Sequence, residues 1–431
     1  MRSQLRDWVD LKRLRELVSS SLYRNAYYIM VSQALMAFLG FFFWVIVARF
    51  YTEAEVGYSG AIISAMGLVA LTGQLGLGSF LVRFLSGSQN KAVVVNTCLT
   101  YTATVTAVAA VICVIGLGIF PSRIGFIAHQ PAFFVAFVAF AVATSLFSMS
   151  GAAFVAHRHA EYMVAKDLVF SVLKLFLPLL FVSYFHAFGI VASWGLATLG
   201  GVMLSLYVLL PRIVRGYMPR PHLGARLVRR AWGYSGMSYI VSLIANAPTF
   251  LMPLMVINAL GPIQNGYFYV AWAIYTVLSA IPGSISQSMF AEAAWNRRTL
   301  HQNIIRSFML AFALVVPAVL FLELCGGRLL LAFGASYSEN SACLLQVLAP
   351  AVVPVTVVKI HFAALRVMGR MRELLAIRTA LTVIVLAAAY LLLAGHGITI
   401  IGWIYVVTHS VAAIAIVVLR SRLWSTPDGG A

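Results

Sequence analysis

Two lysines within long apolar runs are the residues of this sequence best placed to do chemistry. Lys174 lies in the run LVFSVLKLFLPLLFV, and Lys359 lies in the run APAVVPVTVVKIHFAAL. If both runs cross a bilayer as helices, each lysine lies roughly 10 Å below the same surface, at a rise of 1.5 Å per residue. An ammonium group facing an internal cavity at this depth would bind an anion such as phosphate or pyrophosphate. Snorkelling of both side chains to the headgroups is the alternative interpretation.

Further polar side chains extend this candidate site. The arginines expected at the ends of the cavity are Arg83 and Arg306 on the side of the lysines and Arg49 on the opposite side. The polar side chains expected along its wall are Gln33, Asn246, Gln287 and His361. The carboxylates considered for proton coupling are Glu323 and Asp167. Boundary arginines also fix topology and buried amides also join helices, so structural roles stay open for these residues.

Acidic residues are scarce within the apolar runs. Nearly all of the 12 Asp and Glu residues lie in polar stretches or at their edges, and Glu323 comes nearest to an embedded position. A transporter of cations or cationic drugs is expected to hold a carboxylate in its cavity. The embedded charges have the opposite sign, which favours an anionic substrate.

Signals for catalysis are weak. Aspartate occurs only at positions 7, 10, 167 and 428, so no Asp-x-Asp pair is present to hold a metal-bound nucleotide sugar. Glu53 and Glu55 fall in a turn too short to hold an active site. The sequence has no Walker-type loop and no HExxH motif, and its 4 cysteines lack metal-ligand spacing. We therefore expect a protein that is not an enzyme and uses no cofactor or metal.

The composition predicts the elements that position these residues. Hydrophobic residues make up 62% of the 431 residues and charged residues 10%, with a mean hydropathy of +0.94. This composition is typical of an all-α polytopic membrane protein. The apolar runs predict about twelve transmembrane helices, over 25–49, 56–82, 92–119, 132–156, 167–187, 189–211, 233–257, 265–290, 304–325, 342–365, 374–394 and 398–420.

Alternate loops between these helices differ strongly in positive charge. One set, with both termini, carries 25 of the 30 Lys and Arg residues, and the other set carries three. The positive-inside rule then places both termini in the cytoplasm of a multi-pass protein of the cell inner membrane. Orientation also accounts for the net charge of +18, so no nucleic-acid partner is expected. We expect no cleavable signal peptide, because over twenty polar and basic residues precede the first apolar run.

The spans fall into two related halves. Val56-Gly57-Tyr58 recurs in part as Asn265-Gly266-Tyr267, and both turns lie between apolar helices, as in transporters built from internal repeats. The expected organisation is a cytoplasmic amphipathic or basic arm (1–24), an N-lobe of spans 1–6 (25–211), a linker (212–232), a C-lobe of spans 7–12 (233–420) and a tail (421–431). Prolines cluster in spans seven and eight, which we expect to bend.

The first two spans resemble a known family. The matching segments are Asn25-Ala26-Tyr27-Tyr28, Gly40-Phe41-Phe42-Phe43-Trp44, Ala48-Arg49, Glu55-Val56-Gly57, Gly76-Leu77-Gly78 and Leu81-Val82-Arg83-Phe84. They resemble the start of bacterial polysaccharide and O-antigen (Wzx-type) flippases of the multidrug/oligosaccharidyl-lipid/polysaccharide (MOP) exporter superfamily. The resemblance implies a V-shaped pair of six-helix lobes.

The resemblance also implies a substrate, an oligosaccharide linked to a polyprenyl pyrophosphate and moved from the inner to the outer leaflet by alternating access. Lys174 and Lys359 would then bind its pyrophosphate. The expected partners are this substrate, membrane lipids, and the polymerase and chain-length proteins of the same pathway. Two departures limit the resemblance. We expect twelve spans rather than the fourteen of some members, and the first span has only Arg49 as a cation, unlike the arginine-rich first helix of lipid II flippases. A drug/cation antiporter of the same superfamily and a membrane polymerase or glycosyltransferase of the pathway are the alternatives.

Overall fold

The computed structural model describes residues 21–119, 122–295 and 300–425, and the regular elements of this part of the chain are all helices, with no strand. Its helices are α2 (Ser21–Phe50), α3 (Glu53–Gly73), α4 (Leu77–Phe84), η2 (Leu85–Gly87), α5 (Lys91–Ile119), α6 (Phe126–His129), α7 (Pro131–Ala156), α8 (Ala160–Leu204), η3 (Ser205–Leu209), α9 (Leu210–Ile213), α10 (Ala225–Leu260), α11 (Pro262–Trp295), α12 (Leu300–Leu331), α13 (Ala335–Val367), α14 (Met371–His396) and α15 (Thr399–Ser425). Most of the expected N-terminal arm (1–20) and the end of the tail (426–431) lie outside the described residues.

Eleven helices of the described chain are long and apolar enough to cross a membrane. The twelfth expected span is the first part of α8, which carries Lys166, Asp167 and Lys174. Helix α8 reverses direction at His186 (φ 44°, ψ −135°), close to the break expected at residue 188. The two parts lie side by side, because an added Cβ at Gly200 would lie 2.8 Å from a methyl group of Leu173. This hairpin supports the expected count of about twelve spans.

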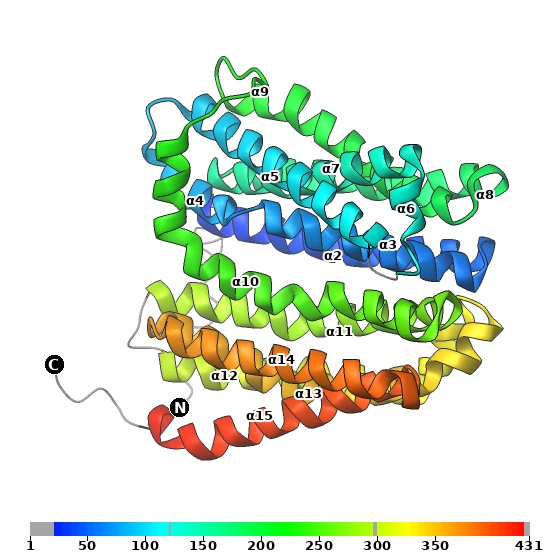
Figure 1. Cartoon of the computed structure of the whole chain (residues 1–431). Helices are drawn as coiled ribbons and strands as arrows, with labels where there is room; N and C mark the ends of the chain where they lie inside the picture. The colour runs from blue at the N-terminus through cyan, green and yellow to red at the C-terminus, as the bar shows by residue number, and fades with distance from the viewer. Residues whose placement is uncertain (1–20, 120–121, 296–299, 426–431) are drawn as a thin grey trace.

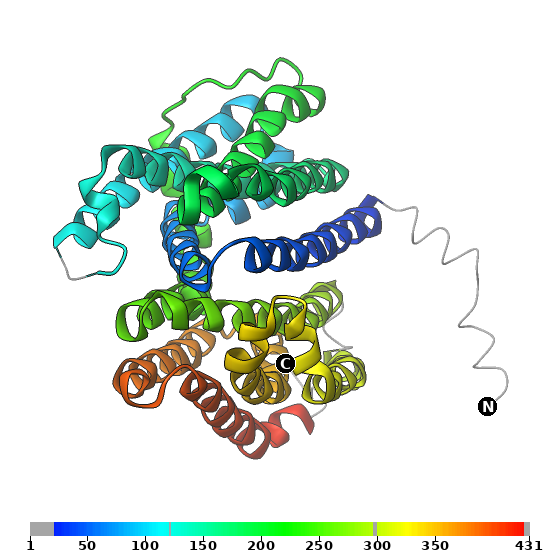
Figure 2. The ribbon, with the colours of Figure 1, turned by 90° about the vertical axis from the view of Figure 1, so that its right-hand side faces the viewer.

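The helices form two groups, a first lobe of α2–α9 and a second lobe of α10–α15 (Figure 1). Figure 2 shows α2 on the side of the first lobe that faces the second. Helix α10 contacts α3 and α4 of the first lobe as well as α11 and α14 of the second. The all-helical, two-lobe MOP-type architecture expected from the sequence is confirmed.

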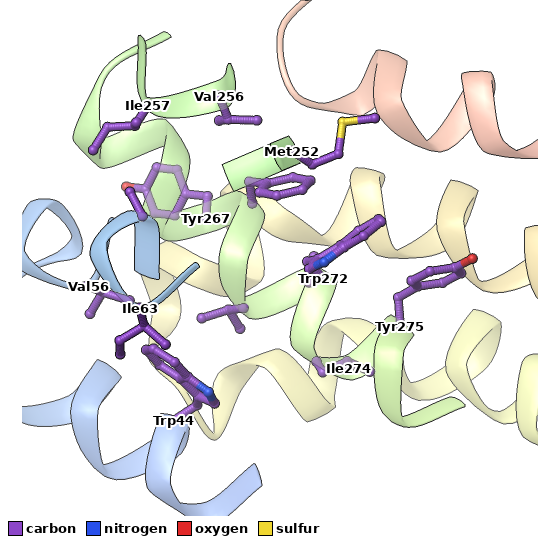
Figure 3. Packing of buried hydrophobic residues seen from close by; sticks show 14 of the residues in the cluster. Trp44, Val56, Ile63, Met252, Val256, Ile257, Tyr267, Trp272, Ile274 and Tyr275 are labelled. Atoms are coloured by element: carbon purple, nitrogen blue, oxygen red, sulfur yellow. The ribbon is translucent and has the colours of Figure 1, made fainter. Parts of the chain in front are cut away.

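The two ends of the bundle differ in how the lobes pack. At one end, which we call the turn end, lie the α2–α3 and α10–α11 turns, and a single apolar core joins both lobes there. Figure 3 shows Trp44 and Ile63 of the first lobe near Tyr267 and Trp272 of the second. At the other end, which we call the basic end, the core of the second lobe is divided into two clusters, one around Ile285 and one around Phe362 and Leu374. The apolar core is therefore continuous between the lobes at the turn end and divided at the basic end.

The second expected span, 56–82, contains a break that the sequence analysis did not predict. Helix α3 ends at Gly73 and α4 begins at Leu77, with positive φ at Leu75 (48°) and Gly76 (72°). The hydroxyl of Tyr239 in α10 donates a 2.6 Å hydrogen bond to the carbonyl of Thr72. A helix end inside a membrane protein leaves carbonyl groups without helical partners, and α10 supplies a donor at this place.

Candidate functional site

A cavity of about 560 Å³ opens in the half of the molecule nearer the basic end. Its wall comes from α10, α11, α13, α14 and α15, so it lies largely inside the second lobe. Within the described lining, Gln33 of α2 is the one residue from the first lobe. The cavity therefore lies mostly within the second lobe rather than between the two lobes.

Four basic side chains line this cavity: Lys359, Arg366, Arg378 and His409. The Lys359 ammonium donates to the carbonyl oxygen of Ser279 at 2.5 Å and to its hydroxyl at 2.9 Å. An added Cβ at Gly283 would lie 3.7 Å from the same ammonium, so this glycine leaves room beside it. The lining contains no Asp or Glu among the described residues, which makes the cavity cationic.

Two buried donors in the cavity wall have no hydrogen-bond partner in the described part of the chain. They are Nε of Arg378 and Nε1 of Trp272. The Arg378 guanidinium lies 4.7 Å from the centre of the Phe362 ring, which fixes its position. An unsatisfied buried donor is costly, so a ligand that accepts hydrogen bonds would be stabilised here.

His409 of α15 also has a fixed orientation in the cavity. Its ring stacks on that of Tyr405 at 5.2 Å, and its Nδ1 lies 3.0 Å from the Tyr405 carbonyl. Because a carbonyl can only accept, Nδ1 carries the proton and donates. Nε2 is then the atom of this ring left to interact with a ligand.

The polar wall residues expected from the sequence are partly brought together. Gln33, Asn246 and Gln287 line the cavity, and the Asn246 amide also donates to the Ser242 carbonyl at 2.8 Å. His361 is fully buried in α13 and lies outside the lining. A helix turns about 100° per residue, so two positions after Lys359 the chain faces away from the cavity.

Lys174 does not line the cavity but is enclosed in the first lobe. Its ammonium lies 4.7 Å from the ring centre of Phe170, 4.9 Å from that of Trp194 and 5.6 Å from that of Phe43. The residue is 2% exposed. In this conformation aromatic faces, rather than a ligand or the headgroups, stabilise its charge.

Asp167 is likewise buried within the first lobe, next to Lys166. The Lys166 ammonium lies 3.2 Å from Asp167 Oδ1, and it donates to the Phe147 carbonyl at 2.8 Å. The hydroxyl of Ser32 in α2 donates to the other carboxylate oxygen. This carboxylate therefore joins α8 to α2, and whether it also carries protons stays a prediction.

The three arginines expected at the cavity ends, Arg49, Arg83 and Arg306, are not among the residues that line the cavity. Arg49 reaches from α2 to the end of α12 and donates to the carbonyls of Leu331 (2.7 Å) and Ala332 (2.8 Å). Arg83 lines a separate hollow beside the start of α10. Arg306 is exposed on α12, and Glu323 is half-buried on the same helix, both outside the cavity lining.

The repeated glycines of the two turns meet at the turn end. A Cβ on Gly57 would lie 1.8 Å from the Pro262 carbonyl oxygen, and a Cβ on Gly266 would lie 2.3 Å from the Glu53 carbonyl oxygen. The Asn265 amide donates to the Gly57 carbonyl at 2.7 Å. Only glycine permits backbones to approach this closely, so the sequence repeat marks the place where the lobes close on each other.

Glu55 has a structural role at this end. Its carboxylate accepts from the backbone N–H of Thr52 at 2.8 Å, while the Thr52 hydroxyl accepts from the backbone N–H of Glu55. This reciprocal pair is a capping box that starts α3. The carboxylate also lies 3.1 Å from Nδ1 of His186, at the bend of α8.

Sequence reasoning missed three basic residues of the cavity, Arg366, Arg378 and His409. The charges of Arg366 and Arg378 were counted with a loop, but α14 begins at Met371, so Arg378 lies seven residues into the helix, about 10 Å from its start. His409 lies inside an apolar run and was detectable as an ionisable residue within a span.

The chain has recognisable relatives in sequence and in fold. The family described as polysaccharide biosynthesis protein matches residues 22–288. No curated protein matches the chain significantly. An inward-facing multidrug resistance MATE family transporter of the MOP superfamily superposes with a TM-score of 0.70 at 17% identity, over 90% of this chain and 94% of that one.

Two further structures share the fold. The lipid II flippase MurJ in an inward closed conformation gives a TM-score of 0.71 at 10% identity, over 91% of this chain and 87% of that one. An outward-facing MATE family transporter gives a TM-score of 0.58 at 17% identity, over 94% of this chain and 95% of that one. At these identities the likeness shows a shared fold.

Proposed function

Because the chain belongs to the polysaccharide biosynthesis protein family and has the MOP-type fold, we propose that it is a flippase for a polyprenyl-pyrophosphate-linked oligosaccharide, such as an O-antigen or exopolysaccharide repeat unit. The observation that carries the proposal is the charge of the cavity. The charged side chains that line it are Lys359, Arg366 and Arg378, without a carboxylate among the described lining residues. A cavity of this sign suits a pyrophosphate and disfavours a cationic drug.

The cations are placed to bind the phosphates of the substrate. Lys359 lies eight residues before the end of α13 and Arg378 seven residues after the start of α14, so both lie about 10–12 Å from the basic end. A pyrophosphate entering from this end replaces its lost hydration with charge-assisted hydrogen bonds. The ammonium and guanidinium groups thereby offset the cost of moving the headgroup out of water.

The cavity also has groups that suit a sugar. Serine, threonine and amide side chains from α10 and α11 lie beside the cations, among them Asn246, Thr249, Ser284 and Gln287. Trp272, Tyr275 and Tyr405 add aromatic surface at the inner end. Hydroxyl and amide groups would hydrogen-bond sugar hydroxyls, and aromatic faces would pack against sugar rings.

The orientation follows the charge asymmetry of the loops. We place the basic end on the cytoplasmic face of the inner membrane, with both termini on that side. The substrate would enter from the inner leaflet, and opening of the turn end would release it to the outer leaflet. Closure there depends on Gly57, Gly266 and Arg49, so these contacts must break during transport.

The test is a chromosomal deletion followed by detection of the lipid-linked oligosaccharide in each leaflet. A membrane-impermeant sugar-labelling reagent is applied to spheroplasts and to inverted vesicles. The proposal expects normal synthesis of the lipid-linked unit and its accumulation in the inner leaflet. Outer-leaflet units that are present but not polymerised would indicate the polymerase instead. An unchanged distribution in both leaflets would contradict the proposal.

A further inference from the structure

A second hollow, of about 580 Å³, lies apart from the cavity at the basic end. It forms where α4 and η2 of the first lobe meet the start of α10, which lie side by side in Figure 1. Its lining residues are Phe80, Arg83, Phe84, Gly87, Ser88, Val94, Arg226, Leu227 and Arg230. None of these lines the first cavity, where the contribution of α10 begins only at Ala245. We call this hollow the flank site.

The flank site carries three uncompensated positive charges. Within the described chain, the guanidinium groups of Arg83, Arg226 and Arg230 make no hydrogen bond or ion pair, although Arg230 lies 5.3 Å from the centre of the Phe84 ring. The segments that build the site lie in stretches of sequence without acidic residues, 56–160 and 168–291. Three guanidinium groups that line one hollow without a carboxylate are suited to bind a phosphate group.

The surroundings of the site are apolar and aromatic. Phe84 packs edge-on against Tyr234 at 4.9 Å. Next to the hollow, Trp232 is 46% exposed, Tyr234 is 52% exposed and Val82 is 48% exposed. Exposed Trp and Tyr side chains beside arginines are typical of the headgroup level of a bilayer, where the acyl chains begin. A soluble anion would gain nothing from this surface, whereas a lipid would cover it.

We propose that the flank site binds the phosphate of an anionic phospholipid of the surrounding leaflet, which is a site distinct from the transport cavity. The bound headgroup joins α4 to the start of α10. The same two elements are already held together by the hydroxyl of Ser235, which donates to the Gly76 carbonyl at 2.9 Å. The lipid therefore stabilises the arrangement in which α10 packs on the first lobe, independently of which substrate the cavity takes.

The test measures lipid retention by the purified full-length protein. Native mass spectrometry of protein from mixed micelles compares phosphatidylglycerol with phosphatidylcholine. The variant Arg83→Gln/Arg226→Gln/Arg230→Gln is expected to retain phosphatidylglycerol at least ~10-fold less than the wild type, because charge-assisted contacts are lost. The matched control is Arg212→Gln/Arg215→Gln/Arg229→Gln, which removes the same charge from exposed arginines outside the flank site. It is expected to change retention less than ~2-fold.

Three results would overturn the proposal. Unchanged retention in the flank-site variant would show that no lipid is bound there. Equal losses in both triple variants would show diffuse attraction to the charged surface. Displacement of phosphatidylglycerol by an equal concentration of glycerol 3-phosphate would show a site for soluble anions. If the triple variant does not fold, Arg226→Gln and Arg230→Gln are tested singly, and no loss in either would overturn the proposal as well.

Discussion

The two embedded lysines lie at similar expected depths in their spans but in different environments in the molecule. Each lies near a glycine of a neighbouring helix. A Cβ added at Gly40 would lie 3.7 Å from the Lys174 ammonium, and a Cβ added at Gly283 would lie 3.7 Å from the Lys359 ammonium. Three aromatic rings then enclose Lys174, whereas Lys359 faces a cavity with Arg378 and His409. A buried cation therefore indicates function only where a ligand can reach it; elsewhere the same residue can be part of the packing.

The largest effect is expected at the buried pair of the first lobe. Asp167→Asn leaves Lys166 without its partner carboxylate, and removing one member of a buried pair costs about 3–5 kcal/mol. The melting temperature of the purified protein in detergent should fall clearly. The double variant Lys166→Met/Asp167→Asn should recover part of the loss, because no unpaired charge remains. An unchanged melting temperature in Asp167→Asn would show that the pair does not stabilise the lobe.

Replacing Lys359 should impair transport more than it impairs stability. Lys359→Met keeps the length of the side chain and removes the ammonium that faces the cavity. Loss of a charge-assisted hydrogen bond to a phosphate corresponds to about 1.5–3 kcal/mol, or ~10–100-fold weaker substrate binding. Transport is measured as the appearance of labelled oligosaccharide in the outer leaflet. Wild-type transport by a normally inserted Lys359→Met protein would contradict the assignment.

A smaller loss is expected from Arg378, whose charge was counted with a loop although it falls within the expected span 374–394. Arg378→Gln removes the charge but keeps an amide donor on the side of Phe362. We expect a ~5–10-fold reduction in transport, since part of the hydrogen bonding persists. Arg372→Gln on the same helix, outside the cavity lining, is the control. Equal effects of both variants would show that the contribution comes from surface charge alone.

The smallest effect on transport is expected at Lys174. Lys174→Met places an apolar side chain among Phe43, Phe170 and Trp194, where the cation–aromatic interaction contributes about 1–2 kcal/mol to stability. Transport by the folded variant should stay within ~3-fold of the wild type, as packing is largely kept. Loss of transport with an unchanged melting temperature would show instead that Lys174 reaches the substrate in another state of the cycle.

The sequence predicted the architecture well because spans and lobes depend on patterns that extend over many residues. Apolar runs and alternating loop charge predicted the spans, and the partial repeat around Gly57 and Gly266 predicted the two lobes. These two glycines lie at the turn end, where the lobes pack closely. The break at Leu75 was missed because residues 56–82 are apolar on both sides of it. Its polar backbone is satisfied by Ser235 and Tyr239, which are distant in sequence.

The candidate site was less predictable because depth in a span does not show which way a side chain faces. Lys359 and Asn246 do line the cavity, but Lys174 is enclosed because α8 folds back and brings Trp194 over it. Counting arginines by loop concealed Arg378, since α14 starts seven residues before it. Which side chains face the cavity depends on how the helices contact one another, and a single sequence does not show these contacts.

The central claim is that a cationic cavity in the second lobe carries a pyrophosphate-linked oligosaccharide across the membrane. The most direct test reconstitutes the wild type, Lys359→Met and Lys174→Met into vesicles with a fluorescent polyprenyl-pyrophosphate oligosaccharide. The fraction that crosses the bilayer is measured with a membrane-impermeant quencher. We predict crossing with the wild type and Lys174→Met and at least ~10-fold slower crossing with Lys359→Met. Equal rates for all three proteins, or equal transport of the same glycan on a polyprenol without phosphate, would contradict the claim.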